Sequence, residues 1–118
     1  MRVILANEPR YEREVLAAAL CALRPGIDVV GLTPDRLDGA LAALRPQLVV
    51  CSEATTAVRA HAPAWVLLYP DDAAHAVVCL DGEERVVSGF GLADLTAAID
   101  AAARDLPAAG GCTAEAGE

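Results

Sequence analysis

The chain alternates short apolar runs with stretches of helical periodicity. The runs are rich in β-branched residues and too short for helices, which is typical of buried strands. They span residues 2–6, 27–32, 47–51 and 65–69. Between them, apolar residues recur at the spacing of helices that bury one face. These helices are predicted over 8–23, 34–45 and 53–61.

The pattern changes after Pro70. Residues 76–80 and 83–87 are both rich in valine and are separated by Asp81-Gly82, a pair that suits a two-residue turn with positive φ. We therefore expect a β-hairpin here, followed by a last helix over 92–106. The first and last helices each carry an apolar stripe that we expect to be buried: Val15, Leu16, Ala19, Leu20 and Leu23, then Leu92, Leu95, Ile99 and Ala102.

Apolar strands that alternate with helices predict an α/β fold. Such strands form a parallel sheet whose two faces are both covered by helices. The expected architecture is a three-layer α/β/α sandwich with the hairpin inserted before the last helix. Residues 1–107 should form one domain, and the small-residue segment 108–118 a mobile C-terminal tail.

Composition narrows the function classes. The net charge is −8, aromatic residues make up 3%, and all nine basic residues are arginines. An acidic chain with few aromatics is unsuited to direct nucleic-acid binding, and a chain without lysine has no Schiff base or P-loop lysine. Early acidic residues argue against a signal peptide, and no apolar run is long enough to span a bilayer. We expect a cytoplasmic protein without a membrane partner.

The cysteines are predicted to be inert. Cys21, Cys51 and Cys79 lie within apolar runs, where a free cysteine behaves as a small hydrophobe. Cys112, in the tail, is the only cysteine expected to be exposed. The spacing contains no ligand cluster for zinc, and Trp65 and Phe90 are expected to fill the core.

The first half of the chain resembles a known family. MRVILANEPRYEREVLAAALCALRPGIDVVGL and LDGALAALRPQLVVCSE are similar to the opening strand, acidic turn, first two helices and phospho-acceptor strand of receiver domains from response regulators of two-component signalling. The resemblance is strongest over residues 1–53. It implies a flavodoxin-like sheet of parallel order 2-1-3-4-5, with the hairpin replacing part of the final βα unit.

The family's chemistry is missing at the matching positions. The two acids that hold magnesium correspond to Asn7 and Glu8, and the phospho-acceptor aspartate corresponds to Ser52. The hydroxyl after the fourth strand corresponds to Tyr69, and the lysine has no counterpart. The resemblance therefore implies a non-catalytic pseudo-receiver that is not phosphorylated and has no cofactor. We expect Ser52 to cap the helix that follows it.

A regulatory or protein-interaction role follows from the altered second half. In receivers this face is where switching is transmitted and where domains dock, and here the hairpin replaces it. An edge hairpin offers unpaired backbone groups to a protein partner or to a second copy in a homodimer; alternatively, its charges only protect the edge. The predicted interaction residues are Val77, Cys79, Asp81, Gly82, Arg85 and Val87.

Two other functions remain open. A small ligand or divalent cation could bind at the strand ends, with Glu8, Asp71 and Asp72 as weak metal candidates, although these residues also suit caps and turns. A Cys51-dependent phosphotransfer or phosphatase-like enzyme is the other alternative, since CSEATT resembles a phosphocysteine loop.

The residues around Cys51 disagree with such a loop. The position where the phosphatase arginine belongs is Ala57, and Glu53 would repel a phosphate. His61 and His75 are expected at a helix end and in a polar turn, without catalytic partners.

Overall fold

The computed structural model describes residues 1–68 and 75–104, which form a single mixed sheet flanked by helices. The strands are β1 (Arg2–Ala6), β2 (Asp28–Gly31), β3 (Leu48–Cys51), β4 (Ala64–Leu68), β5 (His75–Leu80) and β6 (Glu83–Ser88). The helices are α1 (Arg10–Leu23), α2 (Pro34–Leu44), α3 (Thr56–His61) and α4 (Leu92–Arg104). No helix in these ranges is long and apolar enough to cross a membrane.

The strand order is β2-β1-β3-β4-β5-β6. The first four strands are parallel, in the predicted order 2-1-3-4, but β5 pairs antiparallel with β4. A parallel fifth strand would need a crossover of about a dozen residues or more. Only residues 69–74 separate β4 from β5, so the chain can only turn back, and the predicted fifth parallel strand is wrong.

The predicted hairpin is present. β5 and β6 pair antiparallel from His75–Ser88 to Leu80–Glu83. Asp81 and Gly82 form the turn with φ of 55° and 79°. Glycine adopts positive φ without strain, and among the other residues Asn and Asp tolerate it best. β6 is left as the outer strand of the sheet.

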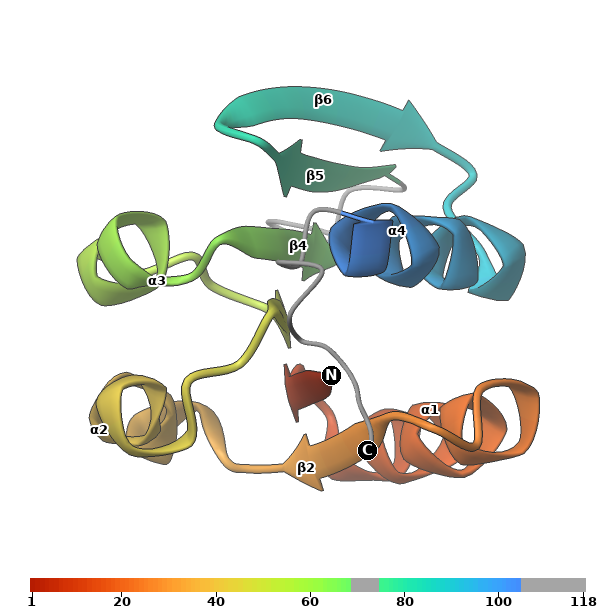
Figure 1. The fold of residues 1–118 in the computed structure, drawn as a ribbon, viewed down its shortest axis with the longest axis horizontal. Helices are drawn as coiled ribbons and strands as arrows, with labels where there is room; N and C mark the ends of the chain where they lie inside the picture. Colours follow the sequence, from red (N-terminus) through yellow and green to blue (C-terminus); the bar gives the residue numbers. More distant parts are fainter. Residues whose placement is uncertain (69–74, 105–118) are drawn as a thin grey trace.

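Helices cover both faces of the sheet, which gives the three layers. Figure 1 shows α1 and α4 on one side and α2 and α3 on the other. Alternating strand residues divide the core between them: Leu5, Val50 and Val66 pack with α1 and α4, whereas Cys51 and Trp65 pack with α2 and α3. As predicted, Trp65 and Phe90 are buried.

Several helix ends differ from the prediction. α1 begins at Arg10, two residues later than expected, and no side chain caps it. α3 begins three residues later than expected, at Thr56, because the Thr55 hydroxyl accepts the hydrogen bond of the Val58 N–H at 3.2 Å. His75 lies in β5 rather than in a turn, while His61 ends α3 as predicted.

The surface also differs from the prediction at one cysteine. Cys21 is exposed, because it lies on the side of α1 that faces away from the sheet. The apolar residues next to Cys21 in the sequence had favoured a buried position. Cys112 and the predicted tail 108–118 lie outside the described residues.

Candidate functional site

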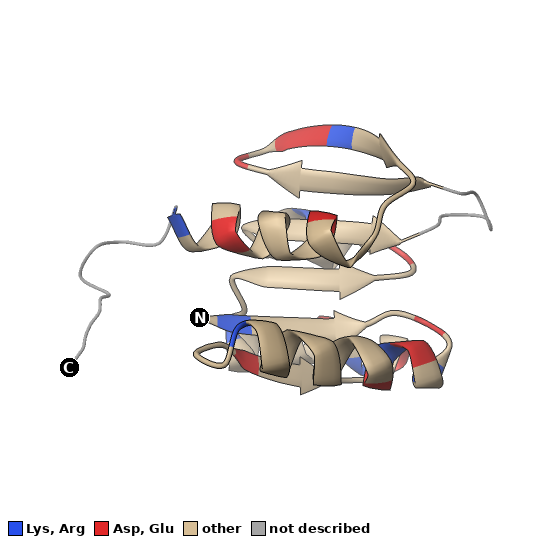
Figure 2. Ribbon diagram, turned by 90° about the vertical axis from the view of Figure 1, so that its right-hand side faces the viewer, with Lys and Arg blue, Asp and Glu red and all other residues tan. Residues whose placement is uncertain are grey.

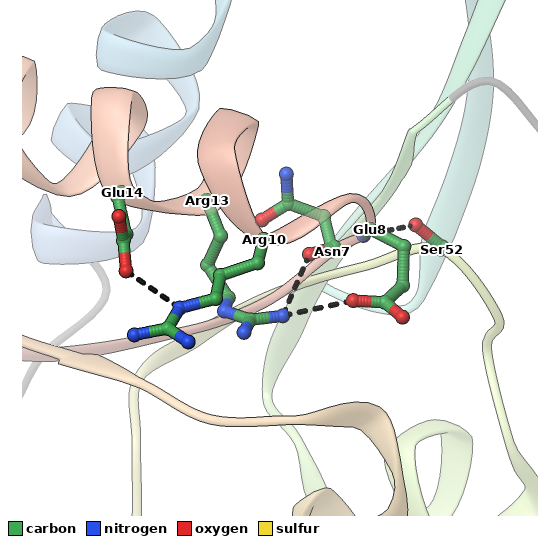
Figure 3. Close-up of polar contacts among 6 residues, drawn as sticks. All are labelled: Asn7, Glu8, Arg10, Arg13, Glu14 and Ser52. Atoms are coloured by element: carbon green, nitrogen blue, oxygen red, sulfur yellow. Dashed lines mark hydrogen bonds and ion pairs between the residues drawn. The ribbon is translucent and has the colours of Figure 1, made fainter.

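The carboxyl ends of β1 and β3 bring the predicted pocket residues together. Ala6 pairs with Cys51 at the end of the parallel ladder, so Asn7 and Glu8 leave the sheet beside Ser52. Figure 3 shows these side chains next to the first turns of α1. Tyr69, Asp71 and Asp72 lie outside the described residues.

Ser52 connects the two strand ends. Its Oγ accepts a hydrogen bond from the Glu8 backbone N–H at 2.8 Å. The prediction that the Ser52 hydroxyl caps α3 is therefore wrong. Thr55 caps that helix instead. Ser52 stabilises the junction between β1 and α1.

The Glu8 carboxylate is paired with an arginine. It lies 3.0 Å from Nη1 of Arg13, and the same Nη1 donates to the Asn7 carbonyl at 3.2 Å. A magnesium or calcium ion needs several oxygen ligands. Within 1–68 and 75–104, no group of three histidine, cysteine, aspartate or glutamate residues could hold a metal ion.

Asn7 is the unusual member of this group. Asn7 is only 1% exposed, and neither the oxygen nor the nitrogen of its side-chain amide has a hydrogen-bond partner among the described residues. In Figure 3 the amide points away from Ser52 and from the Arg13 guanidinium. A buried amide that stays without partners costs roughly 1–3 kcal/mol, which makes this position a candidate for stabilisation by an apolar side chain.

Cys51 is buried on the opposite face of the sheet. It is 1% exposed, and its thiol donates to the Val66 carbonyl at 3.6 Å. Burial raises the pKa of Cys51 to about 12. Because the thiolate is the nucleophile, this environment opposes the chemistry that the enzyme hypothesis requires.

Comparison of the chain with known protein families, curated proteins and solved structures finds no match. The strand ends of β1 and β3 offer a serine that links two strands, a glutamate paired with an arginine and a buried thiol.

An apolar groove near this edge was missed by sequence reasoning. It has a volume of about 220 Å³ between the N-terminal halves of α1 and α4. Three of its apolar residues are exposed: Tyr11 by 66%, Val15 by 65% and Leu92 by 39%. Periodicity had placed Val15 and Leu92 in buried stripes. The remaining lining residues are Glu12, Leu16, Leu68, Phe90, Gly91 and Leu95.

The predicted interaction hairpin exposes less apolar surface. Cys79 is buried and Val77 and Val87 are half-buried, since all three pack against the two cores. Arg85 is exposed, as are the turn residues Asp81 and Gly82. On β6 the exposed apolar residue is Val86, which the sequence analysis had not selected.

Proposed function

We propose that this protein is a non-catalytic, cytoplasmic regulatory module with a flavodoxin-like, receiver-like fold that binds a protein partner through the groove between α1 and α4. The observation that carries the proposal is the exposure of Tyr11, Val15 and Leu92 around one hollow. Contiguous apolar surface of this kind is typical of interaction sites.

The groove is framed by two helices that are linked at their far end. Figure 2 shows α1 and α4 in front of the sheet, with both N-termini at the same end. At the other end Arg24 binds Asp100 through two hydrogen bonds of 2.9 and 2.7 Å. The buried residues Leu68, Phe90 and Leu95 form the floor. A preformed groove lowers the ordering cost of binding.

The size of the hollow favours side chains of a protein over a whole ligand. Ligand pockets usually have volumes of about 300–1,000 Å³, and this one has about 220 Å³. The exposed Tyr11 and Val15 lie one helical turn apart and extend the apolar surface along α1. Apolar residues spaced by one turn on a partner helix would match this arrangement.

The charge of the rim selects the chemistry of the partner. Glu12 lines the groove, and Asp94 lies beside it, accepting a hydrogen bond from the Gly91 N–H at 2.9 Å. The whole chain carries −8, so a second copy would bring like charges together. The occupant we propose is an amphipathic helix whose apolar stripe is flanked by arginine or lysine.

The absence of a phosphoryl switch is part of the proposal. Ser52 stands where the resemblance to receivers places an aspartate, and its hydroxyl is engaged by Glu8. An acyl phosphate forms only on a carboxylate. Regulation would therefore depend on the presence of the partner and not on phosphorylation of this module.

A designed helical peptide tests this function. The probe carries leucines at i, i+4 and i+7 with lysines on both flanks, and its control carries glutamates instead of the lysines. Calorimetry should give binding of the lysine peptide, weakened at least about tenfold by Val15→Ser and by Leu92→Ser. The matched control is Leu23→Ser, because Leu23 is also exposed on α1 but lies outside the groove.

Three outcomes would contradict the proposal. Equal binding of the glutamate peptide would remove the charge argument. Equal weakening by Leu23→Ser would show non-specific adhesion to α1. If light scattering detected a dimer that Val15→Ser dissociates, a second copy would be the occupant and the heterologous partner would be wrong.

A further inference from the structure

A second cavity, on the other side of α1, is lined by arginines. It has a volume of about 530 Å³ and lies between α1, the end of β2 and the start of α2. Its lining residues are Arg10, Arg13, Glu14, Ala17, Gly31, Leu32, Thr33 and Arg36. Three of the nine arginines of a chain with net charge −8 therefore meet around one hollow.

Arg13 is the innermost of the three. Its side chain is only 9% exposed, and its Cγ lies close to Gly31 at the end of β2, where an added Cβ would be 4.0 Å away. Nη1 makes the bonds to Glu8 and Asn7, but Nε and Nη2 make no hydrogen bond to any residue in the described ranges. A nearly buried guanidinium thus keeps donors for which the described residues supply no acceptor.

Arg10 and Arg36 approach from the two helices. Glu14 accepts a 2.8 Å hydrogen bond from Nε of Arg10, which leaves both terminal nitrogens of that guanidinium for another acceptor. Figure 3 shows the guanidinium groups of Arg10 and Arg13 on the same side of α1. Arg36 lies in the first turn of α2 and forms no ion pair within 4.0 Å in the described part of the chain.

The donors of this cavity are side chains and not the N-terminus of α2. Asp35 already occupies that terminus: hydrogen bonds from the Thr33 hydroxyl and from its own backbone N–H lower the pKa of its carboxyl group. Pro34, the first residue of α2, has no N–H to offer. Any anion in the cavity would therefore be bound by guanidinium groups.

Guanidinium groups match one ligand chemistry best. Their planar forks donate pairs of parallel hydrogen bonds to phosphate or carboxylate oxygens. Three forks converging from α1 and α2 suit a group that presents several oxygens in different directions, as a phosphoryl group does and a single carboxylate does not. The volume lies within the range of small-molecule sites, about 300–1,000 Å³, so the cavity has room for more than the phosphoryl group alone.

We infer that this cavity binds a small phosphorylated molecule, whose phosphoryl oxygens accept hydrogen bonds from Arg10, Arg13 and Arg36. The ligand would supply the acceptors that Nε and Nη2 of Arg13 lack. It would also connect α1 to the start of α2, two segments that lie on opposite faces of the sheet. The site is separate from the groove between α1 and α4, so it can be tested independently of the proposed function.

Inorganic pyrophosphate is the probe for this site. Calorimetry at fixed ionic strength should give a Kd below about 1 mM, and saturation should raise the Tm by a few degrees. Arg36→Gln and Arg10→Gln should each weaken binding by about tenfold or more, and the double variant should abolish it. Both side chains are exposed, so neither change threatens folding, unlike a change of Arg13.

Arg85→Gln is the matched control, because Arg85 is an exposed arginine on β6, away from the cavity. Its affinity for pyrophosphate should equal that of the natural chain. Equal loss of binding in Arg85→Gln would indicate only general attraction of anions to arginine. Unchanged binding in the double variant, or no binding by the natural chain, would overturn the site. If citrate bound as tightly as pyrophosphate, the phosphoryl class would be wrong.

Discussion

The two helical layers bury their side of the sheet to different extents. On the side of α2 and α3, Trp65 is covered by the Arg59 guanidinium, which lies 4.9 Å from the ring centroid and bonds Glu84 of β6 at 3.2 Å. On the side of α1 and α4, a hollow of about 220 Å³ lies between the N-terminal halves of the two helices, and Tyr11 and Val15 beside it are exposed. A hollow of about 530 Å³ also lies between α2 and α3, but the exposed large apolar side chains on the described helices are all on α1 and α4. We call the layer of α2 and α3 closed and the layer of α1 and α4 open in this sense.

This difference separates the two hypotheses for function. The candidate nucleophile, Cys51, lies in the closed layer, where burial raises its pKa to about 12. The open layer contains no such nucleophile in its groove but offers apolar surface with an acidic rim. The molecule is therefore better suited to binding a partner than to catalysis at Cys51.

The largest effect should come from the closed layer. Trp65→Ala should lower the free energy of unfolding by about 3–5 kcal/mol, because it leaves a cavity where a large side chain was packed. Val15→Ser in the open layer should change it by only about 0.5 kcal/mol. Urea denaturation measures both. Similar losses for the two variants would show that the layers do not differ.

Asn7→Leu should stabilise the protein by about 1 kcal/mol or more. The change replaces an amide that has no hydrogen-bond partner among the described residues with an apolar side chain that has the same number and branching of heavy atoms, at a buried position before α1. The measurement is again urea denaturation, with Leu5→Val as a control for core volume. A loss of stability would mean that the amide is satisfied in solution.

Cysteine labelling compares the layers at single residues. With a pKa of about 12, Cys51 should hold about three orders of magnitude less thiolate at pH 7.5 than an ordinary cysteine. Iodoacetamide should therefore modify the exposed Cys21 quickly and Cys51 only after unfolding, as peptide mass spectrometry can determine. Rapid native labelling of Cys51 would reopen the enzyme hypothesis. Cys21→Ser provides the background.

The smallest effect should be the pH dependence of the link between α1 and α4. The Arg24 side chain holds the pKa of Asp100 below its usual value. The folded pKa is thus lower than the unfolded one, so this stabilisation is present above pH ~4 and is lost as the pH falls through the folded value. Asp100→Asn should lower the Tm slightly at pH 7, and the difference should vanish in acid. A difference that persists in acid would exclude an ionic origin.

Strand patterns and turn chemistry made much of the fold predictable. Continuous apolar runs such as 47–51 gave the parallel strands, and Asp81-Gly82 gave the hairpin. The direction of β5 was predicted wrongly, because the prediction followed the parallel strand order of receiver domains. The short connection, residues 69–74, favours an antiparallel strand instead. Connection length constrains strand direction physically, and residues 69–74 are too few for a parallel crossover.

The candidate site was less predictable, because it depends on contacts between distant segments. Helical periodicity identifies Val15 and Leu92 as apolar, but only the separation of α1 from α4 leaves them exposed. The role of Ser52 could not be predicted either, since its partner is the Glu8 backbone N–H at the end of the neighbouring strand, which is distant in sequence. The arginine cavity likewise assembles α1 with α2 across the end of β2.

The central claim concerns which surface binds the partner, and chemical-shift mapping tests it most directly. The lysine-flanked peptide should be titrated into ¹⁵N-labelled protein. We predict that the largest amide shifts occur over residues 11–16 and 90–95, around the groove. Shifts confined to the hairpin, residues 75–88, would contradict the account and return the interaction to the edge strand β6.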